Sequence, residues 1–145
     1  MLFKNEEASL KLEIINYELP ADGGDPTSDD RNWLVLRATW CNEEGQIIKD
    51  TNSCLLTYEL QEMTAGLKVV KAGIRQRYES EFAEPYFMLS VDAVEDQFRF
   101  FVSFTLPNTM EDEDVAELYA TMNMEEMTAL IDELDRLCKK FPDRT

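Results

Sequence analysis

Residues 32–40 read N-W-L-V-L-R-A-T-W, a long uninterrupted strand-like run with a tryptophan near each end. Successive side chains of a strand point to opposite faces, so one face of this run is wholly apolar and carries Leu34, Leu36, Ala38 and Trp40. The opposite face is mixed and carries Trp33, Val35, Arg37 and Thr39. This division predicts a strand inside a sheet whose second side is only partly covered.

The size and charge of the chain limit the classes of protein it can belong to. Its 145 residues suit one domain, residues 1–145, with a single core. Thirty Asp and Glu against fourteen Lys and Arg give a formal net charge of -16. Such a surface repels phosphate backbones and anionic membranes and attracts basic proteins, so we expect neither nucleic acid nor a membrane as partner.

The N-terminus and the cysteines indicate where the protein works. The first residues contain no apolar core of signal-peptide length, and no run of about eighteen apolar residues occurs anywhere, so we expect a cytoplasmic protein. Cys41, Cys54 and Cys138 are odd in number and widely spaced among apolar neighbours. This pattern favours structural thiols over a disulfide framework or a zinc site.

Alternating apolar residues predict further strands over residues 9–17, 46–49, 86–92, 98–106 and 115–122. Asp50, Asn52 and Ser53 interrupt the pattern after the second of these, and a helix is also compatible with the last. Short connections between consecutive strands favour antiparallel pairing. We therefore predict an α+β fold, with a mainly antiparallel sheet of about six to seven strands in a meander and two amphipathic helices on one side.

Two segments have the apolar spacing of helices. The first follows Thr57, a predicted N-cap, and ends near Gly73; Gly66 inside it predicts close packing on a strand. The second begins with Asn123 and Glu126, which are spaced as a capping box, and its apolar stripe runs to residue 141. We expect this C-terminal helix to pack on the sheet.

Residues that carry common catalytic chemistry are missing from the sequence. There is no histidine, and therefore neither the commonest general base nor the commonest metal ligand. Gly-rich nucleotide loops and C-x-x-C pairs are also absent, and the aspartates of the turn-rich, mobile loop predicted at residues 21–30 lack the spacing of a calcium site. The sequence predicts no cofactor, no metal and no catalytic residue.

Acidic residues are unevenly distributed. From Phe100 through Asp135 the chain has no lysine or arginine, and the only clear basic cluster is Lys71, Arg75 and Arg77. Acidic fields steer cationic partners, although the same residues also serve solubility as a solvated surface. We predict partner contacts at Asp29, Asp30, Glu111, Asp112, Glu113, Asp114 and Glu117. Tyr119, Tyr58 and Trp33 are candidate aromatic anchors.

Several short strings, in this order, are similar to the WapI-type (wall-associated protein) immunity family of bacterial contact-dependent toxin systems. They are Leu12-Glu13-Ile14 with Tyr17 and Pro20, Asp30 with Asn32-Trp33-Leu34-Val35 and Trp40, residues 54–60, Phe82 with Glu84-Pro85, the strand from Phe98, and Phe141-Pro142 with Arg144. The resemblance spans about the whole domain. It implies that these residues are shared scaffold, so both tryptophans are expected to pack in the core or at its edge.

This resemblance implies an immunity protein that binds and neutralises a toxin domain. Combined with the acidic surface, it predicts a basic toxin domain, such as a nuclease, blocked without chemistry of this chain's own. The alternative is a small-ligand-binding or regulatory domain, whose pocket would lie between the sheet and the terminal helix, with Arg37 or Arg99 meeting an anion. An enzyme ranks third because histidine and catalytic motifs are missing.

Overall fold

The computed structural model describes residues 1–106 and 114–144, and this part of the chain forms eight strands and two α-helices. The strands are β1 (Leu2–Lys4), β2 (Ser9–Tyr17), β3 (Trp33–Cys41), β4 (Ile47–Leu56), β5 (Arg77–Glu79), β6 (Phe87–Val94), β7 (Gln97–Leu106) and β8 (Asp114–Met122). The helices are α1 (Thr57–Lys71) and α2 (Met124–Lys140), and one turn of 3-10 helix, η1 (Asp29–Asn32), precedes β3.

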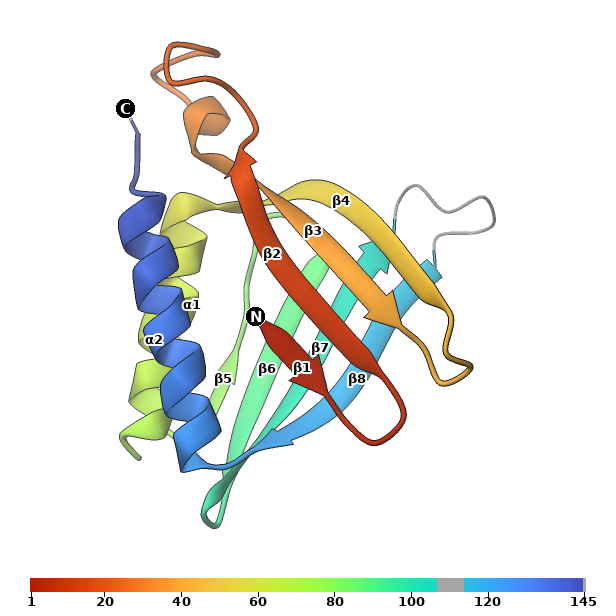
Figure 1. Ribbon diagram of the computed structural model, residues 1–145. Coiled ribbons are helices and arrows are strands. Elements are labelled where there is room, and N and C mark those ends of the chain that lie inside the picture. The colour runs from red at the N-terminus through yellow and green to blue at the C-terminus, as the bar shows by residue number, and fades with distance from the viewer. Residues whose placement is uncertain (107–113, 145) are drawn as a thin grey trace.

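Two four-stranded antiparallel sheets make up the β structure. The N-terminal sheet has the order β1-β2-β3-β4 and the C-terminal sheet the order β5-β6-β7-β8, so each is a meander of consecutive strands. Figure 1 shows the N-terminal sheet in front of the C-terminal sheet and the two helices side by side along one end. The predicted α+β class and antiparallel order are confirmed, and the strands divide between two sheets.

The core lies between the inner faces of the two sheets and beneath the helices. Leu34, Leu36 and Ala38 of β3 are fully buried, as their alternation predicts. Phe98, Phe100, Val102, Phe104 and Leu106 of β7 are buried as well, so β7 supplies five large apolar side chains from one face. The rings of Phe3 and Phe100, with centroids 5.6 Å apart, join the two sheets. Each such burial contributes about 1.5–3 kcal/mol.

The two helices pack on each other and against the sheets. Lys68 of α1 forms an ion pair with Asp135 of α2 at 2.8 Å, and α2 contacts β7 and β8, which confirms the predicted packing of the C-terminal helix on a sheet. The capping box of α2 is present, since Asn123 Oδ1 accepts from the Glu126 amide and Glu126 Oε1 accepts from the Asn123 amide. In the described part of the chain, neither helix is long and apolar enough to span a bilayer.

The start of α1 differs from the prediction. Thr57 is the first helical residue and Leu56 the N-cap, and Thr57 Oγ1 is buried without a partner among the described residues. The capping function belongs to Glu59, which is only 3% exposed: its Oε1 accepts from the Leu56 amide at 2.9 Å and its Oε2 from the Ala83 amide at 2.7 Å. One buried carboxylate therefore fixes both the start of α1 and the segment before β6.

Strand β4 is longer than its sequence pattern predicts. The polar residues 50–53 do not end it, because β3 pairs with β4 from Trp33 opposite Leu56 to Cys41 opposite Ile47. Asp50 points inward and is 8% exposed, and a bulge between Leu34 and Val35 shifts the register. An inward carboxylate and a bulge on an edge strand both hinder pairing with another chain.

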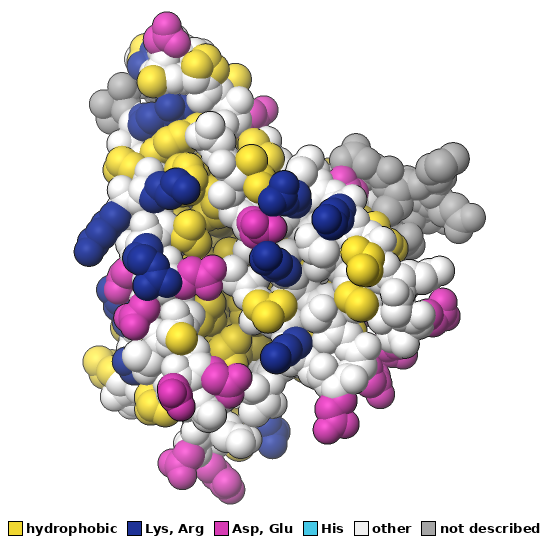
Figure 2. All heavy atoms as spheres, in the orientation of Figure 1, with side chains coloured by type: hydrophobic (Ala, Val, Ile, Leu, Met, Phe, Trp, Pro, Cys, Tyr) yellow, Lys and Arg dark blue, Asp and Glu magenta, His cyan; other side chains and the backbone are white. Residues whose placement is uncertain are grey.

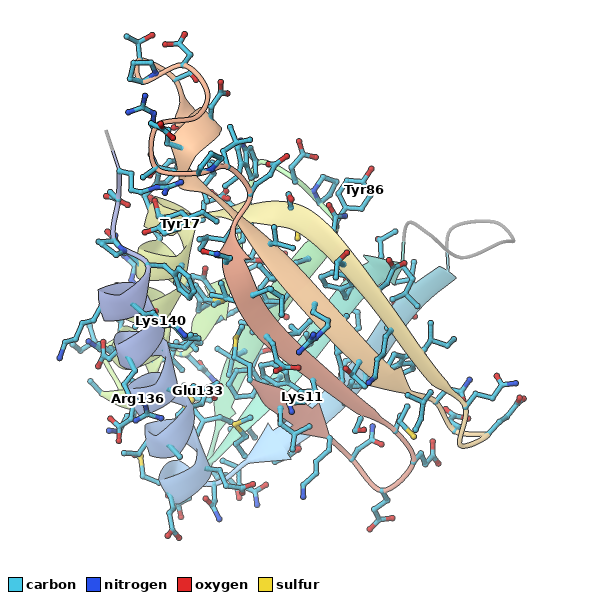
Figure 3. All side chains as sticks on the ribbon, turned by 45° about the horizontal axis from the view of Figure 1, so that its top comes forward. Lys11, Tyr17, Tyr86, Glu133, Arg136 and Lys140 are labelled. Carbon is cyan, nitrogen blue, oxygen red and sulfur yellow. The ribbon has the colours of Figure 1, made fainter. Side chains whose placement is uncertain are left out.

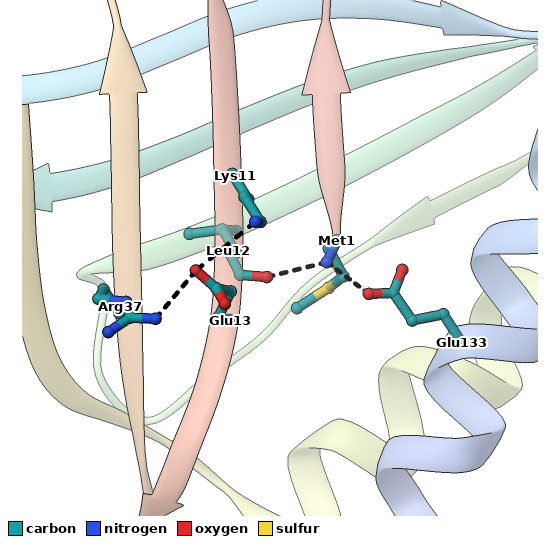
Figure 4. A network of polar contacts seen from close by, with 6 residues as sticks. All are labelled: Met1, Lys11, Leu12, Glu13, Arg37 and Glu133. Carbon is teal, nitrogen blue, oxygen red and sulfur yellow. Dashed lines mark hydrogen bonds and ion pairs between the residues drawn. The ribbon is translucent and has the colours of Figure 1, made fainter. Parts of the chain in front are cut away.

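Strands β1 and β5 are three residues long and each is fastened to a helix. Figure 4 shows the α-ammonium group of Met1, which donates to the Leu12 carbonyl at 2.8 Å and to Glu133 Oε1 of α2 at 2.7 Å. At β5, a Cβ on Gly66 of α1 would lie 2.3 Å from the ring of Tyr78, so the helix meets the strand where only glycine fits. The close packing predicted at Gly66 is confirmed.

Candidate partner-binding surfaces

The predicted contact residues that the structure describes fall into two separate regions. Asp29 and Asp30 belong to η1, in the connection between β2 and β3, whereas Glu117 lies on β8 of the C-terminal sheet. Figure 1 places this connection at the top of the molecule and the start of β8 at the right. Glu111, Asp112 and Glu113 lie outside the described residues, and Asp114 is described only as the first residue of β8.

The carboxylates of the β2–β3 connection serve the loop itself. Asp30 Oδ2 accepts from the Asp25 amide at 3.0 Å, and the Tyr58 hydroxyl donates to Asp29 Oδ2 at 3.4 Å. Hydrogen bonds from the backbone and side chain of Thr27 lower the pKa of Asp25. The predicted loop is present: Asp25 and Asp30 accept hydrogen bonds within it, and Asp29 accepts from Tyr58 of α1.

The C-terminal tail fastens this loop to the rest of the molecule. The guanidinium of Arg144 lies 3.6 Å from the centroid of the Tyr17 ring and donates to the carbonyls of Leu19 and Arg31 at 2.8 and 3.0 Å. The Arg144 amide donates to Asn32 Oδ1 at 2.7 Å. Figure 3 shows Tyr17 close to the end of α2 from which this tail leaves. Several strings that carry the family resemblance thus meet at one structural junction.

The outer face of the C-terminal sheet carries an exposed aromatic pair. Phe101 of β7 and Tyr119 of β8 are directly paired, with ring centroids 4.9 Å apart, and Tyr119 is 73% exposed. Met88 and Val115 are 45% and 48% exposed on the same face. In the strand register both lie toward the same end of the sheet from the aromatic pair, and the exposed Glu117 stands between Tyr119 and Val115. No described helix covers this face, so a tyrosine that is costly to leave in water stands on an open sheet.

A hollow of about 420 Å³ lies on the same face. Its lining includes Arg77, Asp92, Arg99, Phe101 and Tyr119. Arg77 is held by Asp92 at 2.6 Å and by Glu79 at 3.4 Å. We define the C-terminal outer face by Met88, Phe101, Val115, Glu117 and Tyr119. Of these, only Glu117 and Tyr119 are candidates from the sequence. The adjacent phenylalanines at 100 and 101 could have indicated Phe101, because neighbours in a strand face opposite sides and one of the two rings must therefore point outward.

The alternative of a ligand pocket between sheet and terminal helix can be compared with the structure directly. A hollow of about 250 Å³ lies between β1, β8 and α2, lined by apolar side chains with Lys4, Glu126 and Glu133. Glu126 already caps α2 and Glu133 already binds the Met1 ammonium. Arg37 pairs with Glu13 at 3.3 Å, and Arg99 lines the hollow on the C-terminal outer face. Neither arginine lines the hollow between the sheet and α2, so neither could bind an anion there.

The cysteines are free thiols in this structure. Cys54 of β4 is fully buried, and its burial together with the charges of Glu59 and Glu84 raises the pKa of the thiol to about 12. A thiol that stays protonated at neutral pH is a poor nucleophile and a poor metal ligand. Over residues 1–106 and 114–144, no group of three or more Cys, Asp and Glu side chains is placed to hold a metal ion.

Comparison with known protein families identifies the family of this chain. The model of the WapI-like immunity protein family matches residues 1–142. The chain belongs to this family. Membership implies that this WapI-like protein neutralises a toxin and has a cognate toxin partner, and members of such families are typically not catalysts.

Other comparisons add little to the family assignment. No curated protein matches this WapI-like chain. Among solved structures, it is similar to the plant transcriptional regulator PBF-2, with 16% identity over 96% of this chain and 79% of that chain and a TM-score of 0.46. The residues behind the resemblance are mostly structural: Leu12 and Ile14 are buried, Trp33 and Trp40 are half-buried, and Glu59 caps α1.

Proposed function

We propose that this protein neutralises a basic toxin domain by docking the C-terminal outer face onto it, with no reaction of its own. The observation that carries the proposal is Tyr119, which stands 73% exposed on an uncovered sheet and stacks on Phe101. Interface hot spots are enriched in tyrosine because its ring buries a large area at a small entropic cost. Pairing with Phe101 holds the ring in place before binding, which lowers that cost further.

Charge supports a basic partner. Glu117 lies two residues before Tyr119 on the same face of β8, and the four acidic residues 111–114 lie three to six positions before Glu117 in the sequence. The formal net charge of -16 steers a cationic domain towards the protein and raises the association rate. A nuclease is the toxin class that fits best, since a surface that binds phosphates is itself basic.

We propose Asp29 and Asp30 as a second region that contacts the toxin. With Tyr58 they form an acidic end of the molecule, which the structure separates from the C-terminal outer face. A toxin domain that reaches both regions would need to wrap around the end of the sheets. The same binding experiment tests each region separately.

The experiment is calorimetric titration with the toxic domain of the cognate toxin. Tyr119→Ala is expected to weaken binding by about 2 kcal/mol, roughly 30-fold, as for an aromatic hot spot. Glu117→Lys should weaken binding more at low salt than at high salt. Ile74→Ala is the control, because Ile74 is 75% exposed but lies in the connection between α1 and β5.

The outcomes separate the alternatives. If Asp29→Lys/Asp30→Lys loses affinity and Tyr119→Ala does not, the toxin binds at the β2–β3 connection and not at the C-terminal outer face. Unchanged affinity in all these variants would exclude both regions. An affinity that does not depend on salt would contradict acidic complementarity.

A further inference from the structure

Basic side chains gather on one face of this acidic protein. In the N-terminal sheet, Lys11, Thr39 and Lys49 occupy one outward-facing row across β2, β3 and β4, and Glu13 and Arg37 occupy the next. Lys4 lies at the edge on β1, opposite Ser9. Figure 2 shows several dark blue side chains on this side of the molecule, over the N-terminal sheet, with few acidic ones among them. We define the basic face by Lys4, Lys11, Arg37 and Lys49.

The composition of the basic face departs from the rest of the chain. Acids outnumber bases thirty to fourteen in the sequence, yet Glu13 is the one acidic side chain that faces outward among the strands of this sheet. Glu13 is shared, at 3.3 Å from Arg37 and 3.9 Å from Lys11 (Figure 4). Lys4 and Lys49 have no ion pair with any described residue. The face therefore keeps an excess of positive charge.

Carboxylates close the basic face at both ends of its strands. Glu6 and Glu7 lie in the turn between β1 and β2, and Glu43 and Glu44 in the turn between β3 and β4. The acidic connection between β2 and β3 closes the opposite end. From Lys4, opposite Ser9, to Arg37, opposite Glu13, the basic face extends over four residues of β2, or about 14 Å at a rise of about 3.4 Å per residue.

These dimensions decide which anion fits. A nucleic-acid duplex or an anionic membrane extends well beyond about 14 Å and would meet the carboxylates at both ends of the face. A short acidic stretch of protein can stay within the basic rows. Two copies of this protein cannot join basic face to basic face, because like charges would meet across the two-fold axis.

We propose that the basic face binds a short acidic segment of a protein partner, whose carboxylates pair with Lys11, Arg37 and Lys49. This site goes beyond toxin neutralisation through the C-terminal outer face. The two sheets pack inner face to inner face, so the two outer faces point away from each other and can be occupied at the same time.

Fluorescence anisotropy with a short fluorescein-labelled oligoglutamate peptide tests this site on the whole protein. Lys11→Gln/Lys49→Gln is expected to weaken peptide binding about tenfold, since two charge pairs are lost. The matched control, Lys71→Gln/Arg75→Gln, removes the same charge from the end of α1 and its connection to β5, and should change binding less than about twofold. Glu13→Gln should strengthen binding, because it frees Arg37 and Lys11 from their shared carboxylate.

Four results would overturn the proposal. The first is no saturable peptide binding, and the second is an equal loss of affinity in Lys11→Gln/Lys49→Gln and in Lys71→Gln/Arg75→Gln. The third is tighter binding of a single-stranded oligonucleotide or of phosphatidylglycerol vesicles through Lys11 and Lys49. The fourth is self-association in sedimentation that depends on the same two lysines. Tyr119→Ala is expected to leave peptide binding unchanged and Lys11→Gln/Lys49→Gln to leave toxin binding unchanged. The two proposals can therefore fail independently.

Discussion

The two sheets of this protein are built alike and differ on their outer faces. Each has four antiparallel strands, and the inner faces of both supply the core. Outward, the N-terminal sheet presents Lys11, Arg37 and Lys49, whereas the C-terminal sheet presents Phe101 and Tyr119. The inward half of each alternating pattern is limited by packing, and the outward half is free to carry contacts with partners.

The edge strands of the two sheets show a second difference. Strand β1 is held to α2 through charge, by the Met1 ammonium and Glu133, and β5 is held to α1 through shape, by Gly66 and Tyr78. Charge tolerates small shifts and is weakened by salt, whereas close packing tolerates neither added volume nor a lost ring. Substitutions at the two edges should therefore differ in size and in salt dependence.

The largest effect is expected from Gly66→Val. Its side chain would enter the space of the Tyr78 ring and should lower the free energy of unfolding by about 3 kcal/mol in urea titration. Ala65→Val, on the exposed side of the same helix turn, is the control for helix propensity. If both variants lose the same stability, close packing at β5 does not hold this edge. Tyr78→Ala in the Gly66→Val background should recover part of the loss.

The next largest effect is expected on stability at alkaline pH, to which one side chain of each sheet contributes. Burial, with nearby acidic charges, raises the pKa of Cys54 in β4 from 9.0 and of Tyr78 in β5 from 10.0, both to about 12. Between the ordinary and raised pKa values the unfolded chain binds fewer protons than the folded one, so stability falls as pH rises. The slope for Cys54 is at most about 1.4 kcal/mol per pH unit.

Urea titrations at several pH values between 9 and 12 measure these contributions. Cys54→Ala should flatten the curve from the lower end of this range, and Tyr78→Phe only from near pH 10. A curve that neither substitution alters would show that other groups govern alkaline unfolding.

A smaller effect is expected at the other edge. Glu133→Gln replaces the ion pair with the buried Met1 ammonium by a neutral hydrogen bond and should cost about 1 kcal/mol, because Glu133 is partly exposed. Asp132→Asn, the exposed neighbour on α2, removes the same charge without that contact. The difference between the two variants in urea titration should shrink at high salt; a difference that grows would contradict an ionic tie.

The smallest effects on stability are expected on the outer faces. Lys49→Gln should change the free energy of unfolding by less than about 0.5 kcal/mol, since an exposed charge without an ion pair contributes little to folding. Thermal unfolding with Thr51→Ser, an exposed neutral position on the same strand, supplies the comparison. A loss above about 1 kcal/mol would assign Lys49 to the fold and weaken its role in binding.

The sequence predicted what depends on local pattern. Alternation identified the buried side of β3 and β7, spacing identified both helices, and Gly66 indicated a close approach. Strands β1 and β5 were missed because three residues are too few for a period, and they form only by pairing with their neighbours. Alternation also says which side of a strand is buried without saying which sheet the strand joins.

The candidate binding surfaces, like the short strands, depend on strand pairing that local sequence patterns do not show. Lys71, Arg75 and Arg77 are close in sequence, yet Arg77 is neutralised by Asp92 and Glu79. The basic face combines residues that are up to 45 positions apart, from Lys4 to Lys49, and only the strand register brings them together. Surfaces built from several strands depend on pairing that a single sequence does not display.

The tie between Met1 and Glu133 also decides how the protein can be handled. Any residue added before Met1 converts the ammonium to an amide, which has one hydrogen where the ammonium donates to two oxygens. An affinity tag at that end would loosen β1 from α2 beside Lys4, within the basic face. At the other end, the contacts of Arg144 are made by its amide and its guanidinium, so residues added after Thr145 leave the groups that make these contacts unchanged. Immobilisation for binding measurements therefore belongs at the C-terminus.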